Sequence, residues 1–378
     1  MAKVSARATD EQIKQIGLEP NNCGKYSLNK EEYTKLCEIK QQTGSAKQKA
    51  SLRALGVEAH EGIVVNSPYY WDKSDPKYSF FVKNPLFTSE EENTFKEDLL
   101  DSLKDHAPKY PSIKRKKQKD GHLLVIDIAD LHINKYATAE LTGAEYNSKL
   151  AVERAIEGTK GLLEKSSGFH IDKILFVMGN DVLNTDNLLK QTTKGTPQDT
   201  DVSWFEAFII AKKCYVECLE LCLSVADVDV IHCPSNHDQM SGCFLAETVA
   251  THFRLCDNIT FNTSPAYRKY YQYHSNFIGL EHGDKGKAAN LPLVYAQTEP
   301  KLWYETKFRY GYLHHVHHSD VKQYQSSKDY IGVNITYLRS PSSADIWHAD
   351  STYLNMVAVE GFIHSKTNGR VSHLTHYF

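Results

Sequence analysis

Short apolar runs alternate with amphipathic stretches from residue 121 onward, and this alternation constrains the fold more than any other feature of the chain. The apolar runs occupy residues 123–128, 174–178, 228–233 and 277–280, and the helical patterns occupy 145–165, 201–225 and 243–255. Strands that alternate with helices are typical of a layered α/β domain. Residues 330–338 and 356–364 are strand-rich again. We therefore expect an α/β domain that extends over 121–378.

Residues 1–110 differ in character from this domain. Two short helical patterns near 29–44 and 46–55 precede two strand patterns at 62–65 and 78–82. Their order predicts a small N-terminal α+β domain. A winged-helix-like module that binds nucleic acid and an accessory domain without that role both fit the pattern.

The segment 111–120 contains the densest run of basic residues in the chain, at 113–119. Its position between the two patterns favours a linker. Such a run can contact a nucleic-acid backbone, but it can equally be a solvated connection. The predicted organisation is thus an N-terminal accessory domain at 1–110, a basic linker at 111–120, and a main domain at 121–378.

Composition excludes several classes of protein. The chain has 44 Lys and Arg against 47 Asp and Glu, which excludes a globally basic nucleic-acid binder but leaves room for a local basic patch. Cys214, Cys218 and Cys222 share one helix face and are interpreted as small buried hydrophobes rather than a thiolate metal site. We expect a cytoplasmic protein without a membrane segment, since the sequence shows neither a secretory leader nor a long apolar stretch.

Five polar segments stand out, and four of them directly follow predicted strands. They are Asp-Leu-His at 130–132, Gly-Asn-Asp at 179–181, Ser-Asn-His-Asp at 235–238, Glu-His-Gly-Asp at 281–284 and His-His-Val-His at 314–317. Ligands of α/β sheets gather outside the carboxyl ends of the strands. Each residue alone could be an ordinary polar residue at a strand end, but the set predicts one shared site.

The residue types in these segments indicate metal chemistry. Asp, His and Asn supply oxygen and nitrogen ligands without thiolates, which suits Mn, Fe, Zn or Ni. A carboxylate between two ions, with imidazoles on both sides, is the minimal form of a two-metal site that activates water and clamps a phosphoryl group. The sequence contains neither a Gly-x-Ser-x-Gly elbow nor a phosphate-binding P-loop motif.

The order of these motifs over about 121–320 resembles the calcineurin-like metallophosphoesterase superfamily, whose pattern is D-x-H, G-D, G-N-H-[DE], a lone His and G-H-x-H. Further stretches at 196–199, 267–271 and 338–341 resemble a phage-encoded, DNA-repair-exonuclease-like branch and extend the likeness nearly to the C-terminus. The resemblance implies a four-layer β-sandwich flanked by helices. It does not cover residues 1–110.

The resemblance also implies two divalent metal ions, with Mn²⁺ favoured and Fe, Zn, Ni or Mg as alternatives. The implied ligands are Asp130, His132 and His317 for the first ion, Asn236, His282 and His315 for the second, and Asp181 as the bridge. A hydroxide held between the metals would be the nucleophile. His237 would act near the leaving oxygen as a general acid or transition-state stabiliser, oriented by Asp238.

Three positions depart from the family pattern. Asn180 separates Gly179 from Asp181, Ser235 replaces a glycine, and His314 replaces another. Glycine at such positions permits a positive φ or a close backbone approach. The departures therefore bear on the backbone geometry of the loops more than on the identity of the metal ligands.

The resemblance favours a nuclease that acts on DNA. A phosphodiesterase for small or cyclic nucleotides and a non-catalytic, metal-containing DNA-binding protein remain open as alternatives. Related nucleases imply a homodimer, and a phage origin would place the protein in the host cell cytoplasm.

Overall fold

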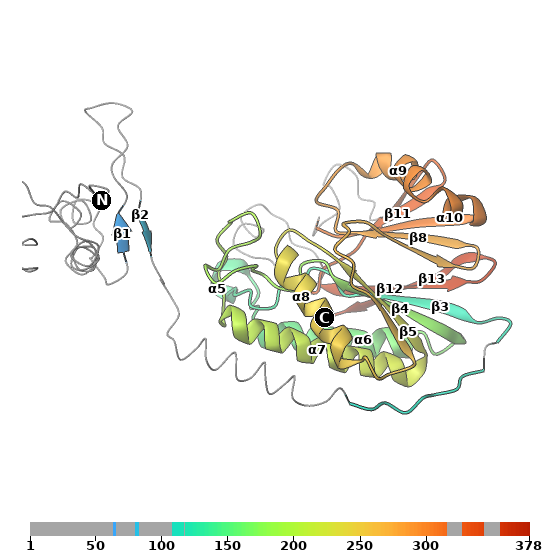
Figure 1. Ribbon diagram of the computed structural model, residues 1–378, viewed down its shortest axis with the longest axis horizontal. Coiled ribbons are helices and arrows are strands. Elements are labelled where there is room, and N and C mark those ends of the chain that lie inside the picture. Colours follow the sequence, from blue (N-terminus) through green and yellow to red (C-terminus); the bar gives the residue numbers. More distant parts are fainter. Residues whose placement is uncertain (1–62, 66–79, 83–107, 117, 316–326, 344–355) are drawn as a thin grey trace, which may run out of the picture. The chain divides into compact units, whose positions relative to one another are not determined.

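The computed structural model describes residues 63–65, 80–82, 108–116, 118–315, 327–343 and 356–378 (Figure 1). The chain divides into two compact units, Met1–Phe87 and Thr88–Phe378, while the boundaries drawn from the sequence stay a prediction. In the first unit, β1 (Ile63–Val65) pairs antiparallel with β2 (Phe80–Val82), which confirms the two strands expected there. The predicted N-terminal helices lie outside the described residues.

The second unit contains two sheets. The six-stranded sheet has the order β13 (Gly369–Tyr377), β12 (Ala358–Ser365), β3 (His122–Asp127), β4 (Ile171–Gly179), β5 (Asp227–Cys233) and β6 (Ile259–Asn262). The five-stranded sheet has the order β10 (Ser327–Tyr330), β11 (Val333–Tyr337), β9 (Phe308–Leu313), β8 (Asn276–Glu281) and β7 (Lys269–Tyr273). Strands β3 to β6 are mutually parallel, and so are β8, β9 and β11.

Helices cover the outer faces of both sheets, which confirms the predicted four-layer α/β sandwich (Figure 1). One helical layer consists of α6 (Ser148–Lys165), α7 (Trp204–Val225) and α8 (Gln239–His252), and the other of α9 (Leu291–Thr298) and α10 (Pro300–Glu305). Short helices α5 (Ala139–Thr142) and η1 (Ala288–Asn290) lie in connections. In β3, Leu124 and Ile126 join the core under the helices, whereas Leu123 and Val125 join the core that includes residues of both sheets. Burial on both faces explains the unbroken apolar run.

Helix α7 shows how local sequence sets the outer layer. Ser203 and Glu206 form a capping box that starts the helix. Cys214, Cys218 and Cys222 are buried in the core against the six-stranded sheet, so their interpretation as small hydrophobes is confirmed. Among the described residues, no helix is long and apolar enough to cross a membrane.

The basic segment belongs to the second unit and packs against the six-stranded sheet. Arg115 forms an ion pair of 2.5 Å with Asp227, and the backbone of Ile113 exchanges two 2.8 Å hydrogen bonds with the side chain of Asn258. Asp227 begins β5, whose other end leads to Asn236. A strand of this length spans about 20 Å. The segment therefore lies at the end of the sheet opposite the predicted metal ligands, where it does not line their site.

His364, in the middle of the sandwich, predicts acid sensitivity. Its ring is fully buried, Nε2 lies 2.8 Å from the Tyr312 hydroxyl, and burial lowers its pKa to about 3. The unfolded state therefore binds more protons than the folded state between this value and the ordinary value near 6.5, so stability falls as pH falls through that window.

We expect this one group to cost about 2–3 kcal/mol of unfolding free energy at pH 4.5 relative to pH 7.5. Urea unfolding of wild type and His364→Gln across this range measures the effect. Wild type should lose that much more stability than the variant. Parallel stability curves for the two proteins would show that His364 does not titrate in this way.

Candidate metal centre

The predicted ligand segments follow the carboxyl ends of parallel strands in both sheets. Asp130 follows β3, Asp181 follows β4 and Asn236 follows β5, whereas His282 and His315 follow β8 and β9. Three of these residues have a left-handed backbone conformation, since φ is 52° at Asp130, 62° at Asp181 and 67° at His315. Left-handed conformations in non-glycine residues are strained and cluster at functional sites.

Three predicted ligands surround a ring nitrogen of a fourth, His282. Nε2 of His282 lies 2.8 Å from Asn236 Oδ1, 3.1 Å from Asp181 Oδ2 and 3.2 Å from His315 Nδ1. The His282 and Asp181 side chains are almost completely buried. Asp181, His282 and His315 have ligand atoms close enough to hold a single metal ion.

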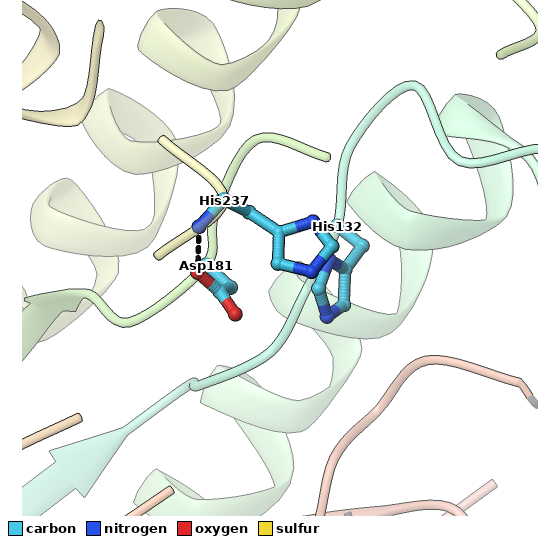
Figure 2. Close-up of side chains that lie close together, drawn as sticks. All are labelled: His132, Asp181 and His237. Carbon is cyan, nitrogen blue, oxygen red and sulfur yellow. Dashed lines mark hydrogen bonds between the residues drawn. The ribbon is translucent and has the colours of Figure 1, made fainter. Parts of the chain in front are cut away.

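Asp181 also belongs to a second group, with His132 and His237 (Figure 2). The ring centroids of the two histidines lie 4.6 Å apart, and the backbone N–H of His237 donates to Asp181 Oδ1 at 2.9 Å. One carboxylate thus faces both groups, as the predicted bridge requires. The structure places His237 among the candidate ligands of this group, although we predicted a role for it outside the ligand set.

Asp238 does not orient His237 as we predicted. His237 Nδ1 lies 2.9 Å from the carbonyl oxygen of Asn184, which can only accept, so Nδ1 carries the proton and Nε2 faces other partners. The Asp238 carboxylate instead accepts hydrogen bonds from the Ser235 hydroxyl at 2.5 Å and from the Leu183 backbone at 2.9 Å. Asp238 therefore holds Ser235 and the segment that follows Asp181, while the carbonyl of Asn184 holds the imidazole.

Asp130 lies beside the same cluster. One of its carboxylate oxygens accepts from the backbone N–H of His315 at 3.3 Å, and Ser340 donates to its carbonyl at 2.8 Å. Its other oxygen, Oδ1, is buried without a hydrogen-bond partner. His317, the remaining predicted ligand, lies outside the described residues.

The oxygen and nitrogen atoms of this cluster are better suited to binding divalent cations than to forming hydrogen bonds with one another. A neutral imidazole has one ring proton, so at most one of the three contacts of His282 Nε2 can be a hydrogen bond that it donates. Asp130 Oδ1 is buried and has no hydrogen-bond partner, and Asp181 Oδ2 makes the 3.1 Å ion pair with His282. Buried lone pairs that converge without protons between them are suited to a cation.

The ionisable groups of the cluster shift one another's pKa values. Burial raises the pKa of Asp181, but the positive charges of His282 and His237 outweigh burial and hold it well below its usual range. Burial lowers the pKa of His282, yet the Asp181 carboxylate raises it to about 9. Burial raises the pKa of Asp130 to about 6. A bound cation would keep these carboxylates ionised and the imidazoles neutral, so metal binding should release protons.

The departures from the family pattern have structural roles. Ser235 accepts a 2.7 Å hydrogen bond from the Asp181 backbone while its hydroxyl donates to Asp238. His314 is fully buried, with Nε2 3.0 Å from Asp127 Oδ1. Sequence reasoning did not predict Asp127 as a supporting residue. Its signal was a carboxylate that directly follows the apolar run of β3.

Ser235 gives a prediction at this site. Ser235→Ala removes both bonds of the hydroxyl, so the Asp181 backbone loses its support, and we expect a loss of about 10- to 100-fold in metal affinity or activity. Ser224→Ala, which removes an exposed hydroxyl near the end of α7, is the matched control. Metal titration and phosphodiester hydrolysis measure the effect. Equal values for both variants would exclude a supporting role for Ser235.

No family model and no curated protein matches the chain. Solved structures that resemble it include a Vps29 double mutant from Entamoeba histolytica, with 12% identity, 68% of this chain and 99% of that chain covered, and a TM-score of 0.27. Thermotoga maritima protein TM1076 has 10% identity, coverage of 68% and 99%, and a TM-score of 0.26. Chaetomium thermophilum Vps29 bound to a cyclic peptide has 10% identity, coverage of 69% and 97%, and a TM-score of 0.28. Similarity at this level determines no activity, which depends on the site residues.

Proposed function

We propose that the chain is a two-metal-dependent phosphodiester hydrolase and that its substrate is DNA. The observation that carries the proposal is the position of Asp181, whose carboxylate belongs to both groups of candidate ligands. A shared carboxylate of this kind is what a pair of neighbouring divalent ions requires. The motif order that resembles metallophosphoesterases supports the same activity.

Most of the site residues would hold the metal ions, and His237 has a separate role. Asp181, His132, Asn236, His282, His315 and Asp130 would hold the ions. Two divalent ions would supply an activated water and neutralise charge on the phosphoryl group. His237, whose Nδ1 is fixed by the Asn184 carbonyl, presents Nε2 for proton donation to the leaving oxygen or for metal ligation.

DNA is proposed because of the likeness to DNA-repair-exonuclease-like proteins and because a segment with exposed lysines is hydrogen-bonded to the backbone of a candidate ligand. The backbone N–H of Thr193 donates to the carbonyl of Asn236 at 3.2 Å, which ties the segment with exposed Lys190 and Lys194 to a candidate ligand. Lysines beside the ligands favour an anionic substrate larger than a single phosphate. We propose Mn²⁺ as the metal and a homodimer as the assembly on the resemblance alone.

A substrate panel tests the proposal. Full-length protein, stripped with EDTA and reloaded with Mn²⁺, is assayed with labelled single- and double-stranded DNA, bis-p-nitrophenyl phosphate and cyclic nucleotides, and its bound metal is counted. We expect about two ions per chain and cleavage of DNA that depends on the metal. Turnover of cyclic nucleotides alone would show that the substrate is a small nucleotide rather than DNA. Metal binding without turnover of any substrate would exclude the hydrolase.

A further inference from the structure

Tyr267 fixes the loop that follows His282. Its hydroxyl accepts hydrogen bonds from the backbone of Gly283 at 3.0 Å and of Lys285 at 3.3 Å, and it donates to Asp284 Oδ1 at 2.7 Å. One phenol therefore holds three consecutive residues of the loop immediately after a candidate metal ligand. Such bonds restrict a segment that would otherwise be an exposed turn.

The ring of Tyr267 also restrains a cation. The ammonium of Lys285 lies 4.3 Å from the ring centroid, and Lys285 is exposed. A cation–π contact orients an ammonium group without neutralising its charge. The nearby Arg268 is already paired with Glu281 at 2.7 Å, and the loop carboxylate of Asp284 accepts the phenol proton. Lys285 is thus the oriented cation of this loop that remains accessible to a ligand.

We infer that Lys285 binds a non-reacting phosphate of the substrate strand, next to the phosphate that is cleaved, and that Tyr267 is its positioning residue. The inference rests on the proposed function. Lys285 lies three residues beyond His282, and an ammonium group cannot ligate a cation, so it suits a phosphate that positions the strand rather than one that reacts. Its long side chain acts as a point charge for phosphate oxygens.

Steady-state kinetics of the Mn²⁺-loaded full chain test this inference. With a single-stranded oligonucleotide, Lys285→Ala should raise KM about tenfold, the effect of one lost charge-assisted hydrogen bond. The slope of log(kcat/KM) against log[salt] should become shallower by about 0.7–1. KM for bis-p-nitrophenyl phosphate, which has one phosphate, should change less. Lys285→Arg should restore the oligonucleotide KM, and Tyr267→Phe should raise it while kcat is retained.

Lys301→Ala is the matched control, because it removes the same charge from an exposed position on α10. Helix α10 ends just before β9 begins, whereas His315 follows the other end of β9. If Lys285→Ala matches Lys301→Ala in KM and salt slope, the inference is overturned while the proposed function stands. Loss of bound metal in Lys285→Ala also overturns it, because the loop would then be structural. If wild type hydrolyses bis-p-nitrophenyl phosphate but no oligonucleotide, the DNA proposal fails and the inference fails with it.

Discussion

Asp181→Asn is expected to lower kcat for phosphodiester hydrolysis by about 10³-fold or more, beyond the 10- to 100-fold typical of residues that only support ligands. An amide is neutral and offers one acceptor oxygen, so it cannot serve two cations as a carboxylate does. The replacement has nearly the same shape, and its oxygen can still accept the 2.9 Å hydrogen bond from the His237 backbone. The fold should therefore remain intact.

Metal content separates this explanation from a general loss of structure. Elemental analysis of Asp181→Asn should show fewer bound ions per chain than wild type, while circular dichroism stays the same. Asp257→Asn, which changes an exposed carboxylate, should behave as wild type in both measurements. Wild-type turnover by a folded Asp181→Asn protein would contradict a shared bridging carboxylate.

His237→Ala has the second-largest expected effect, a loss of about 10²- to 10⁴-fold in kcat if His237 protonates the leaving oxygen. In that case the metal content is unchanged. The loss should be much smaller with bis-p-nitrophenyl phosphate than with DNA, because p-nitrophenolate is a stable leaving group that needs little help from an acid.

The structure also groups His237 with His132 and Asp181 as candidate ligands, and the same variant tests this role. If His237 is a ligand, His237→Ala loses an ion, and the rate falls equally for both substrates. Asp238→Asn gives a useful comparison, because Asp238 contacts Ser235 and Leu183 rather than the imidazole. If Asp238→Asn reproduced the leaving-group dependence of His237→Ala, Asp238 would orient the His237 imidazole after all.

The fold was largely predictable because its strands are buried on both faces. A strand such as β3 contains an unbroken apolar run at residues 123–126 that is buried on both faces, so this run is conspicuous in the sequence. Strands β6, β7, β9, β10 and β13 were not predicted as strands. Polar and half-buried residues interrupt their patterns, as in β13, where exposed and partly buried residues alternate. All of these strands except β9 lie at the edge of a sheet, and edge strands depend on their neighbours more than on their own composition.

The sequence by itself determined which segments carry the candidate metal ligands, because ligands of α/β sheets follow strand ends and the order of the motifs can be recognised in a single chain. It did not determine the partners of each side chain. Asp238 follows His237 directly, yet its carboxylate binds Ser235 and Leu183 while Asn184 fixes the imidazole. Tertiary structure decided these contacts, since residues brought together by different strands compete for the same hydrogen bonds. That competition depends on distances and directions in space, which spacing along the chain does not encode.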